Sequence, residues 1–245
     1  MGDLAGRVVI ITGARRGLGR DFAKLFAADG AHVVLADIQD ASAATQAASE
    51  TGPRCIAVQT DVTDRASVDA LMAATLAEFG RLDVLINNAA LWREPESYGI
   101  LDCPLDVWNA TWAVNLTGVL NCYQAAVPLM REGGFGRIIN VSSTASATGS
   151  NSYGLSKCAL ELMTSGMARE VGKDAITVNS IVPGICAFSG AKGQLPGFDQ
   201  ILARIPLGRV GSSQDLYAAM AYLCSDAAGW VTGENMVLDG GLSTR

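Results

Sequence analysis

A tyrosine and a lysine stand four residues apart in the segment Tyr153-Gly154-Leu155-Ser156-Lys157. On a helix this spacing places both side chains on one face, one turn from each other. A lysine ammonium beside a phenol favours the phenolate and so lowers the pKa of the phenol from about 10 toward the range useful for general acid–base chemistry. The same spacing also arises by chance on amphipathic helices. The pair is therefore a candidate catalytic site whose interpretation depends on the rest of the chain.

A glycine-rich segment near the N-terminus is typical of dinucleotide binding. It follows the first expected strand, opens the first expected helix, and reads Thr12-Gly13-Ala14-Arg15-Arg16-Gly17-Leu18-Gly19. Its glycines permit a tight turn, let a pyrophosphate approach the backbone, and let the helix pack close to the sheet. The phosphates would meet free N–H groups at the positive end of the helix. Because the glycine spacing departs from the common Gly-x-Gly-x-x-Gly, a purely structural turn remains the alternative.

An aspartate indicates which dinucleotide is bound. Asp37 ends the second expected strand, where a carboxylate can accept hydrogen bonds from the adenosine ribose hydroxyls of NAD. It would repel the 2′-phosphate of NADP, whereas Arg16 could pair with that phosphate. We expect the repulsion to dominate, so that NAD is preferred over NADP. Asp61 and Val62, after the third strand, are expected to close over the adenine, with a helix cap as the alternative role of Asp61.

Strand-like and helix-like segments alternate along the whole chain. The expected strands are 7–11, 32–36, 54–59, 84–86, 137–141, 176–182 and 235–238. The expected helices are 18–28, 41–49, 65–79, 105–130, 153–171 and 214–224. This alternation predicts a parallel sheet covered by helices on both faces, in a single domain spanning 1–245. Residues 187–205 are rich in glycine and proline without a clear period, so they are expected to form a substrate loop.

The composition excludes several classes of function. Hydrophobic residues make up 49% of the 245-residue chain but occur in short runs, and no run approaches the roughly 18 apolar residues of a membrane span. The net charge of −6 argues against nucleic acid or an anionic membrane as the main partner. No clustered ligands suggest a metal site, and the lone His32 argues against Ser-His catalysis. The cysteines are far apart, which indicates reduced thiols and a cytoplasmic location; they are Cys55, Cys103, Cys122, Cys158, Cys186 and Cys224.

With these residues in place, the chain resembles the short-chain dehydrogenases/reductases along essentially its whole length. Further family-like segments are Asn87-Asn88-Ala89-Ala90, Val114-Asn115-Leu116-Thr117-Gly118, Ile139-Asn140-Val141-Ser142-Ser143, Pro183-Gly184 and Leu238-Asp239-Gly240-Gly241. The resemblance implies a Rossmann-like α/β fold with a seven-stranded, doubly wound parallel sheet, usually in a homotetramer. It also implies an NAD(P)-dependent oxidoreductase that interconverts a secondary alcohol and its ketone.

The resemblance assigns roles to individual residues. Tyr153 is the acid/base, and Lys157 holds the nicotinamide ribose while lowering the pKa of the tyrosine. Ser143 binds the reacting oxygen, and Asn115 helps to hold a proton-relaying water. Other implied cofactor contacts are Asn88, Ala89, Pro183, Gly184 and Ile185. Ser143 precedes Tyr153 by fewer residues than is common in the family, so Ser142 stays open as the alternative.

The expected pocket gives a partial indication of the substrate. The expected substrate contacts are Trp92, Ser143, Tyr153, Ile185 and Phe188. Because the lining is mostly apolar, we expect an uncharged hydrophobic secondary alcohol, which could carry a ring. An acyl-carrier-protein-linked 3-ketoacyl reductase is the alternative; it would need a basic patch, to which Arg131, Arg169 and Lys173 could contribute. A catalytically silent NAD-binding regulator is a third reading, which the retained tyrosine and lysine disfavour.

Overall fold

The computed structural model describes residues 4–92, 98–187 and 198–243 and contains the expected parallel sheet. Seven strands pair in the order β3-β2-β1-β4-β5-β6-β9, and every pair is parallel. Their bounds are β1 Val8–Thr12, β2 His32–Asp37, β3 Cys55–Gln59, β4 Val84–Asn87, β5 Gly136–Val141, β6 Ile176–Pro183 and β9 Asn235–Leu238. All seven expected strands are present, and the α/β, doubly wound architecture is confirmed.

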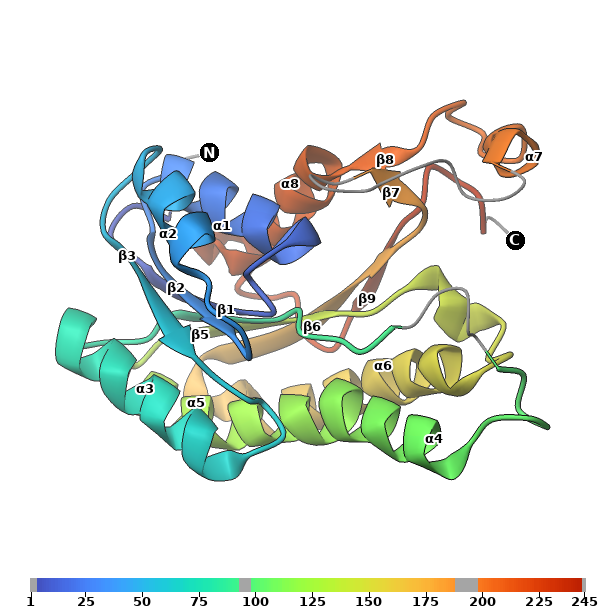
Figure 1. Cartoon of the computed structure of the whole chain (residues 1–245). Helices are drawn as coiled ribbons and strands as arrows, with labels where there is room; N and C mark the ends of the chain where they lie inside the picture. Colours follow the sequence, from blue (N-terminus) through green and yellow to red (C-terminus); the bar gives the residue numbers. More distant parts are fainter. Residues whose placement is uncertain (1–3, 93–97, 188–197, 244–245) are drawn as a thin grey trace.

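Helices cover both faces of the sheet (Figure 1). One layer consists of α1 (Gly17–Ala28), α2 (Ser42–Ser49) and α8 (Ser213–Cys224). The other consists of α3 (Arg65–Phe79), α4 (Leu105–Trp112), α5 (Gly118–Gly133) and α6 (Ser152–Val171). Among the described helices, none is long and apolar enough to cross a bilayer.

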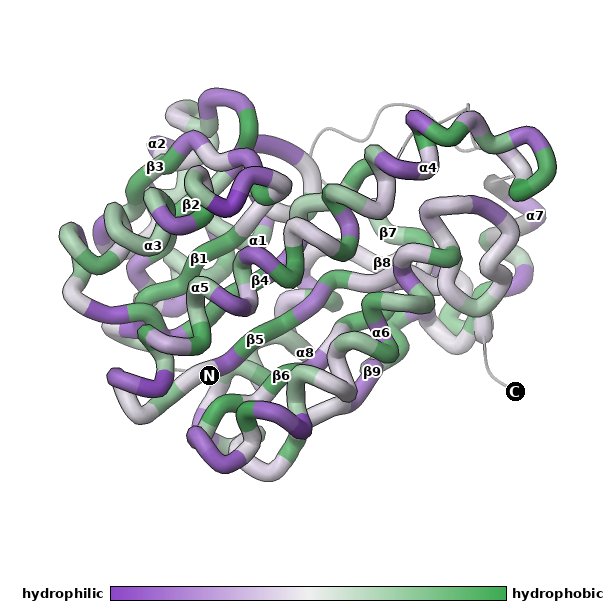
Figure 2. The backbone as a smooth tube through the Cα atoms, turned by 90° about the horizontal axis from the view of Figure 1, so that it is seen from below, coloured by the Kyte–Doolittle hydropathy of each residue, from purple (hydrophilic) through white to green (hydrophobic). Residues whose placement is uncertain are grey.

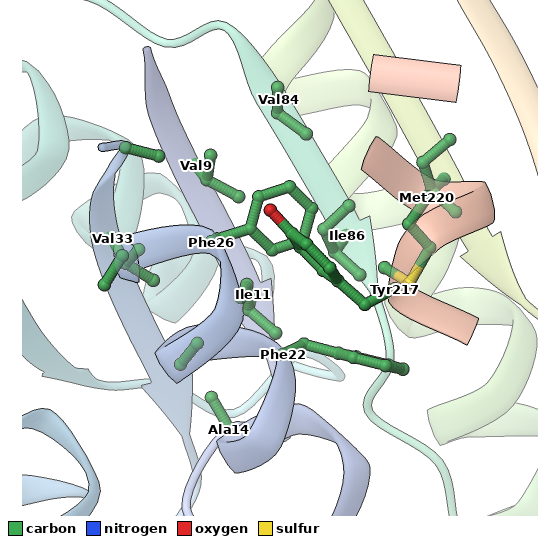
Figure 3. Packing of buried hydrophobic residues seen from close by; sticks show 14 of the residues in the cluster. Val9, Ile11, Ala14, Phe22, Phe26, Val33, Val84, Ile86, Tyr217 and Met220 are labelled. Atoms are coloured by element: carbon green, nitrogen blue, oxygen red, sulfur yellow. The ribbon is translucent and has the colours of Figure 1, made fainter. Parts of the chain in front are cut away.

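The sheet is buried on both faces, which explains its sequence. Strands β1, β4 and β5 are buried along their whole length, and such strands read as continuous runs of β-branched and other apolar residues. Figure 2 shows hydrophobic stretches along strands such as β1 and β5. On the α1/α8 side, Phe26 meets Tyr217 edge to face with ring centroids 5.0 Å apart, over Val9, Ile11 and Ile86 (Figure 3).

Two expectations need correction. The expected helix 105–130 is divided by a π-helical turn, Ala113–Thr117, whose extra residue per turn changes which side chains face inward. The expected irregular stretch 187–205 contains a short helix, α7 (Phe198–Leu202). Its base is closed by a two-stranded parallel ribbon of β7 (Cys186–Ala187) and β8 (Gly211–Ser212). Local periodicity could not reveal this ribbon because its two strands are far apart in sequence.

The strand order determines where a ligand can enter. The chain winds from β1 outward to β3 and then returns to β4 on the other side of β1. Between β1 and β4 the loops at the carboxyl ends diverge, which is where ligands bind in open α/β sheets. Strands β1, β4, β5 and β6 all end at this edge, and the segments that follow them carry the residues singled out from the sequence.

Candidate active site

Helix α6 presents Tyr153 and Lys157 together. The helix begins after Asn151, whose side chain accepts a hydrogen bond from the backbone N–H of Gly154 at 2.8 Å. Tyr153 is half-buried in the first turn, and Lys157 is only 2% exposed one turn later. The Lys157 Nζ atom lies 5.6 Å from the centre of the Tyr153 ring. The pair therefore shares one face of the helix, as its spacing predicts.

The cap of α6 has a measurable consequence. We expect Asn151→Ala to lower the free energy of unfolding by about 1 kcal/mol, because it leaves the Gly154 amide without its side-chain acceptor. Chemical denaturation measures the change. Asn151→Asp keeps an acceptor oxygen and should stay close to the wild-type stability. Equal stability of the alanine and aspartate variants would contradict a capping role.

Of the two serines after β5, Ser143 is the one that reaches Tyr153. Its side chain hydrogen-bonds the tyrosine side chain. Ser142 is buried, and its Oγ donates instead to Glu161 Oε1 at 2.6 Å. Neighbouring side chains of an extended segment point in opposite directions, so only one of the two can face the site. The 3₁₀ turn Thr144–Ala147 spans the short connection to α6.

The proton affinities in this cluster depart from the sequence-based expectation. Burial raises the pKa of Tyr153, and the hydrogen bond with Ser143 opposes the rise. Burial also lowers the pKa of Lys157 to about 8, while the charge of Glu161 opposes that shift. The expected lowering of the Tyr153 pKa is thus not met, because desolvation of the phenol dominates and the Lys157 ammonium donates to the Val141 carbonyl at 2.7 Å.

Asn115 is completely buried on the π-helical turn and joins two parts of the site. Its Oδ1 accepts from the Leu91 N–H at 2.8 Å, while its Nδ2 donates to the Leu91 carbonyl at 3.3 Å and to Ser156 Oγ at 2.9 Å. Both amide hydrogens are therefore used within the protein. The side chain fastens the segment after β4 to α6, and its part in holding a relay water stays a prediction.

The glycine loop has the shape that a dinucleotide requires. Gly13 has φ of +64°, and a Cβ there would lie 2.8 Å from the Cα of Ala89. A Cβ on Gly19 would collide with the Gly13 carbonyl oxygen. Thr12 and Asn88 fix the loop: Thr12 Oγ1 accepts from the Asn88 and Ala89 amides at 3.0 Å, and Asn88 Nδ2 donates to the Thr12 and Gly13 carbonyls.

The first turn of α1 suits an anion. Arg16 is the N-cap residue, and its side chain accepts no hydrogen bond from the turn, which begins at Gly17 and Leu18. Free backbone N–H groups at the positive end of a helix bind phosphate. Together with the cradle around Gly13 and Gly19, this donor set fits the pyrophosphate of a nicotinamide dinucleotide.

Asp37 is oriented by the glycine loop. Its Oδ2 accepts from the backbone N–H of Arg15 and its Oδ1 from that of Gln39, both at 3.0 Å. The carboxylate is partly exposed at the carboxyl end of β2. Each oxygen retains a lone pair that could accept from a ribose hydroxyl. Arg16 is exposed nearby in sequence, on the loop itself.

Asp61 does not cap a helix. Its Oδ1 accepts from the N–H and the Oγ1 of Thr63, forming a local turn, and Asp64 is the residue that caps α3. Val62 is buried against Gly118, where an added Cβ would lie 2.6 Å from Val62 Cγ2. The role of Asp61 and Val62 at the adenine stays a prediction.

The remaining predicted contacts lie beside Tyr153, at the end of β6, or outside the residues that the structure describes. Trp92 is 51% exposed, and its ring centroid is 6.4 Å from that of Tyr153. Pro183 ends β6, and the Gly184 N–H donates to the Leu238 carbonyl, which places half-buried Ile185 at the same edge of the sheet. Phe188 lies outside the described residues, as does most of the predicted substrate loop.

Glu161 is a polar residue of the site region that the sequence reasoning missed. It is half-buried on α6 and bonded to Ser142. Its position four residues after Lys157 was the available signal, because i and i+4 side chains share a helix face. Within the described part of the chain, no group of three His, Cys, Asp or Glu side chains could hold a metal ion.

Comparison with known proteins places this geometry among oxidoreductases. Residues 13–243 match the family model described as Enoyl-(Acyl carrier protein) reductase. The chain is 38% identical over 248 residues to cis-4-hydroxycyclohexanecarboxylate dehydrogenase of Sinomonas cyclohexanicum, covering 98% of each chain. It is 35% identical to the 3-oxoacyl-[acyl-carrier-protein] reductase of Synechocystis, covering 99% of each. A crystal structure of a short-chain type dehydrogenase/reductase from Mycobacterium marinum superposes with a TM-score of 0.91 at 29% identity, over 99% of this chain and 98% of that one.

Proposed function

Because the chain belongs to the short-chain dehydrogenase/reductase family of oxidoreductases, we propose that it interconverts a secondary alcohol and its ketone, with NAD as the preferred cofactor. The observation that carries the proposal is the cluster of Ser143, Tyr153 and Lys157 at the carboxyl edge of the sheet. Ser143 is joined to Tyr153 by a hydrogen bond, and Lys157 lies one helical turn from Tyr153. Ser143 and Tyr153 can therefore act on a single substrate oxygen, while Lys157 acts on Tyr153.

Each member of the cluster has a role in moving the proton. The bound nicotinamide would supply the hydride chemistry. Tyr153 takes the hydroxyl proton during alcohol oxidation and returns it during ketone reduction. Ser143 donates a hydrogen bond to the substrate oxygen, and the Lys157 ammonium favours the phenolate of Tyr153 whenever the proton has left. Lys157 would also hold the nicotinamide ribose.

The preference for NAD is supported by Asp37. Its carboxylate is held toward the glycine loop by the Arg15 amide, at the position where an adenosine ribose would lie. A ribose hydroxyl can donate to this carboxylate, whereas a 2′-phosphate would bring like charges together. Arg16 is exposed on the glycine loop, where its guanidinium could pair with a 2′-phosphate and favour NADP; we expect the repulsion to be the larger effect.

A hydrophobic substrate is supported by Trp92. Trp92 is half exposed and its ring lies beside that of Tyr153, so apolar surface is available next to the proposed acid/base. A ring could pack against this surface. One relative is named for a hydroxylated cyclohexane ring that also carries a carboxylate, so the proposal must be tested with and without that charge.

The test is the absorbance of the reduced nicotinamide across a panel of secondary alcohols, with NAD and NADP in parallel. The panel includes cyclohexanol, 4-hydroxycyclohexanecarboxylate and small charged hydroxy acids. NAD-dependent turnover of the hydrophobic alcohols is the expected result. Selective turnover of the charged hydroxy acids would overturn the substrate class, and absence of turnover despite NADH binding would favour a silent NAD-binding regulator.

A carrier-linked 3-ketoacyl reductase is the second candidate, favoured by the name of the Synechocystis relative. The basic patch expected for it is not supported by the fold. Arg131 lies in the last turn of α5 and pairs with Asp174 at 2.7 Å. Arg169 and Lys173 lie at the end of α6 and just after it, so all three precede the strands β5 and β6 at the amino edge. The site is at the opposite, carboxyl edge.

We propose that the chain forms a homotetramer. Leu105 on α4 and Leu162 on α6 are 77% and 73% exposed, and burial of such side chains favours association. Light scattering of the purified protein tests this proposal. A monomer mass would overturn it.

A further inference from the structure

Consecutive residues at the end of β5 each bond a different residue of α6. The carbonyl of Val141 accepts from Lys157 Nζ at 2.7 Å, and the next residue, Ser142, donates to Glu161 Oε1 at 2.6 Å. The following residue, Ser143, bonds the side chain of Tyr153. The three partners stand four residues apart on one stripe of the helix, and they are Tyr153, Lys157 and Glu161.

Lys157, the middle one of these three residues, lies in an environment that is unfavourable for a charge. Lys157 is 2% exposed, and its hydrogen bond is to a neutral carbonyl rather than to a carboxylate. Burial favours the neutral amine. A neutral Lys157 could not stabilise a phenolate on Tyr153. A negative charge close to the lysine is therefore needed if the ammonium is to persist at neutral pH and above.

Glu161 is the residue that meets this need. It lies one turn beyond Lys157 on the same helix, and its charge favours the protonated lysine. Ser142 fixes one of its oxygens and also points its Oγ toward the Lys157 carbonyl at 3.4 Å. The carboxylate is thereby held at the base of the site instead of rotating into solvent.

We propose that Glu161, held by Ser142, is a positioning residue that keeps Lys157 protonated beside Tyr153 and so sets the upper pH limit of the reaction. The inference rests on the proposed function, in which Lys157 acts on Tyr153. Glu161 would touch neither substrate nor cofactor.

The other elements around Lys157 supply no competing charge among the described residues. From α6 itself, Tyr153 and Glu161 are the titratable groups on the helix face of the lysine, and the neighbouring thiol of Cys158 is exposed. Strand β5 and its end supply the Val141 carbonyl and two serine hydroxyls, and the π-helical turn supplies the neutral amide of Asn115, which is bound to Ser156. The protonation of Lys157 therefore depends chiefly on burial and on Glu161.

The variant Glu161→Gln removes the negative charge of the side chain while keeping its size and shape. The amide oxygen can still accept from Ser142, but the negative charge is gone. Without it Lys157 loses its proton at a lower pH, so the alkaline limb of kcat for ketone reduction should move down by about one pH unit. KM at neutral pH should change little. Glu161→Asp keeps the charge and should restore the wild-type limb, whereas Glu132→Gln, an equal charge change at the exposed end of α5, should have no effect.

A second readout does not depend on turnover. The lysines of the chain are Lys24, Lys157, Lys173 and Lys192, few enough to follow by ¹³Cε NMR in the protein without cofactor, with Lys157→Met for assignment. The Lys157 titration midpoint should be lower in Glu161→Gln than in the wild type. An unchanged midpoint would overturn the inference, as would an unchanged alkaline limb. A shifted midpoint in a protein that turns over no alcohol or ketone would instead overturn the proposed function and leave the Glu161–Lys157 relation standing.

Discussion

Replacing Tyr153 by phenylalanine is expected to lower kcat by about 10³-fold, because it removes the group that exchanges the proton with the substrate oxygen. The ring of Tyr153 is half-buried beside Trp92, and phenylalanine can keep this packing. The loss should therefore fall on kcat, while the dissociation constant for NADH stays at the wild-type value. Steady-state kinetics and fluorescence titration with NADH measure the two quantities.

A matched control for this variant is Tyr123→Phe. Tyr123 on α5 also carries a partly buried hydroxyl, but it donates to Glu170 at 3.1 Å and faces no part of the site. Its removal should leave kcat unchanged. If Tyr153→Phe turned over substrate as fast as Tyr123→Phe, the phenol would not be the acid/base, and Ser143 would become the candidate.

Exchanging Asp37 for asparagine is expected to lower the ratio of kcat/KM for NAD to that for NADP by roughly 100-fold. Hydrogen bonds to a charged group contribute about 1.5–3 kcal/mol, and each 1.4 kcal/mol is a factor of ten. The substitution weakens the bonds to the ribose and removes the repulsion of a 2′-phosphate. Asparagine can still accept from the Arg15 or Gln39 amide, so the loop should keep its shape.

The control for the cofactor variant lies three residues after Asp37, in the segment that follows β2. Asp40 is exposed and bonds Ser42, so Asp40→Asn makes the same change of charge away from the glycine loop. It should leave the ratio near the wild-type value. An unchanged ratio in Asp37→Asn would mean that the carboxylate does not face the ribose. A wild-type enzyme that prefers NADP would mean that Arg16 outweighs Asp37.

Residue patterns within short stretches of the sequence were sufficient to predict the fold. The β-branched runs within Val8–Thr12 and Gly136–Val141 identified the buried strands, since parallel strands covered on both faces are rich in β-branched and other apolar residues. The glycines at 13, 17 and 19 indicated the cradle before α1, since a side chain at Gly13 or Gly19 would collide with its surroundings. The i, i+4 spacing of Tyr153 and Lys157 was likewise a local property.

Contacts between distant residues decided what the sequence left open. Which of Ser142 and Ser143 faces Tyr153 depended on the packing of β5 against α6: Ser142 bonds Glu161, and Ser143 bonds the tyrosine. The proton affinity of Tyr153 rose instead of falling because burial depends on the whole fold. The π-helical turn gave Asn115 a fastening role toward Leu91 and Ser156.

The sequence by itself therefore determined the class of fold and predicted the glycine loop and the shared helix face of Tyr153 and Lys157, since periodicity, turn chemistry and helical spacing are encoded within a few residues. Only the tertiary structure decided which serine faces the tyrosine, that Glu161 is bonded to Ser142 one turn beyond Lys157, and that Arg131, Arg169 and Lys173 lie at the edge of the sheet opposite the site. Desolvation and hydrogen bonding between separate elements depend on how the whole chain packs, and no local pattern of residues specifies them.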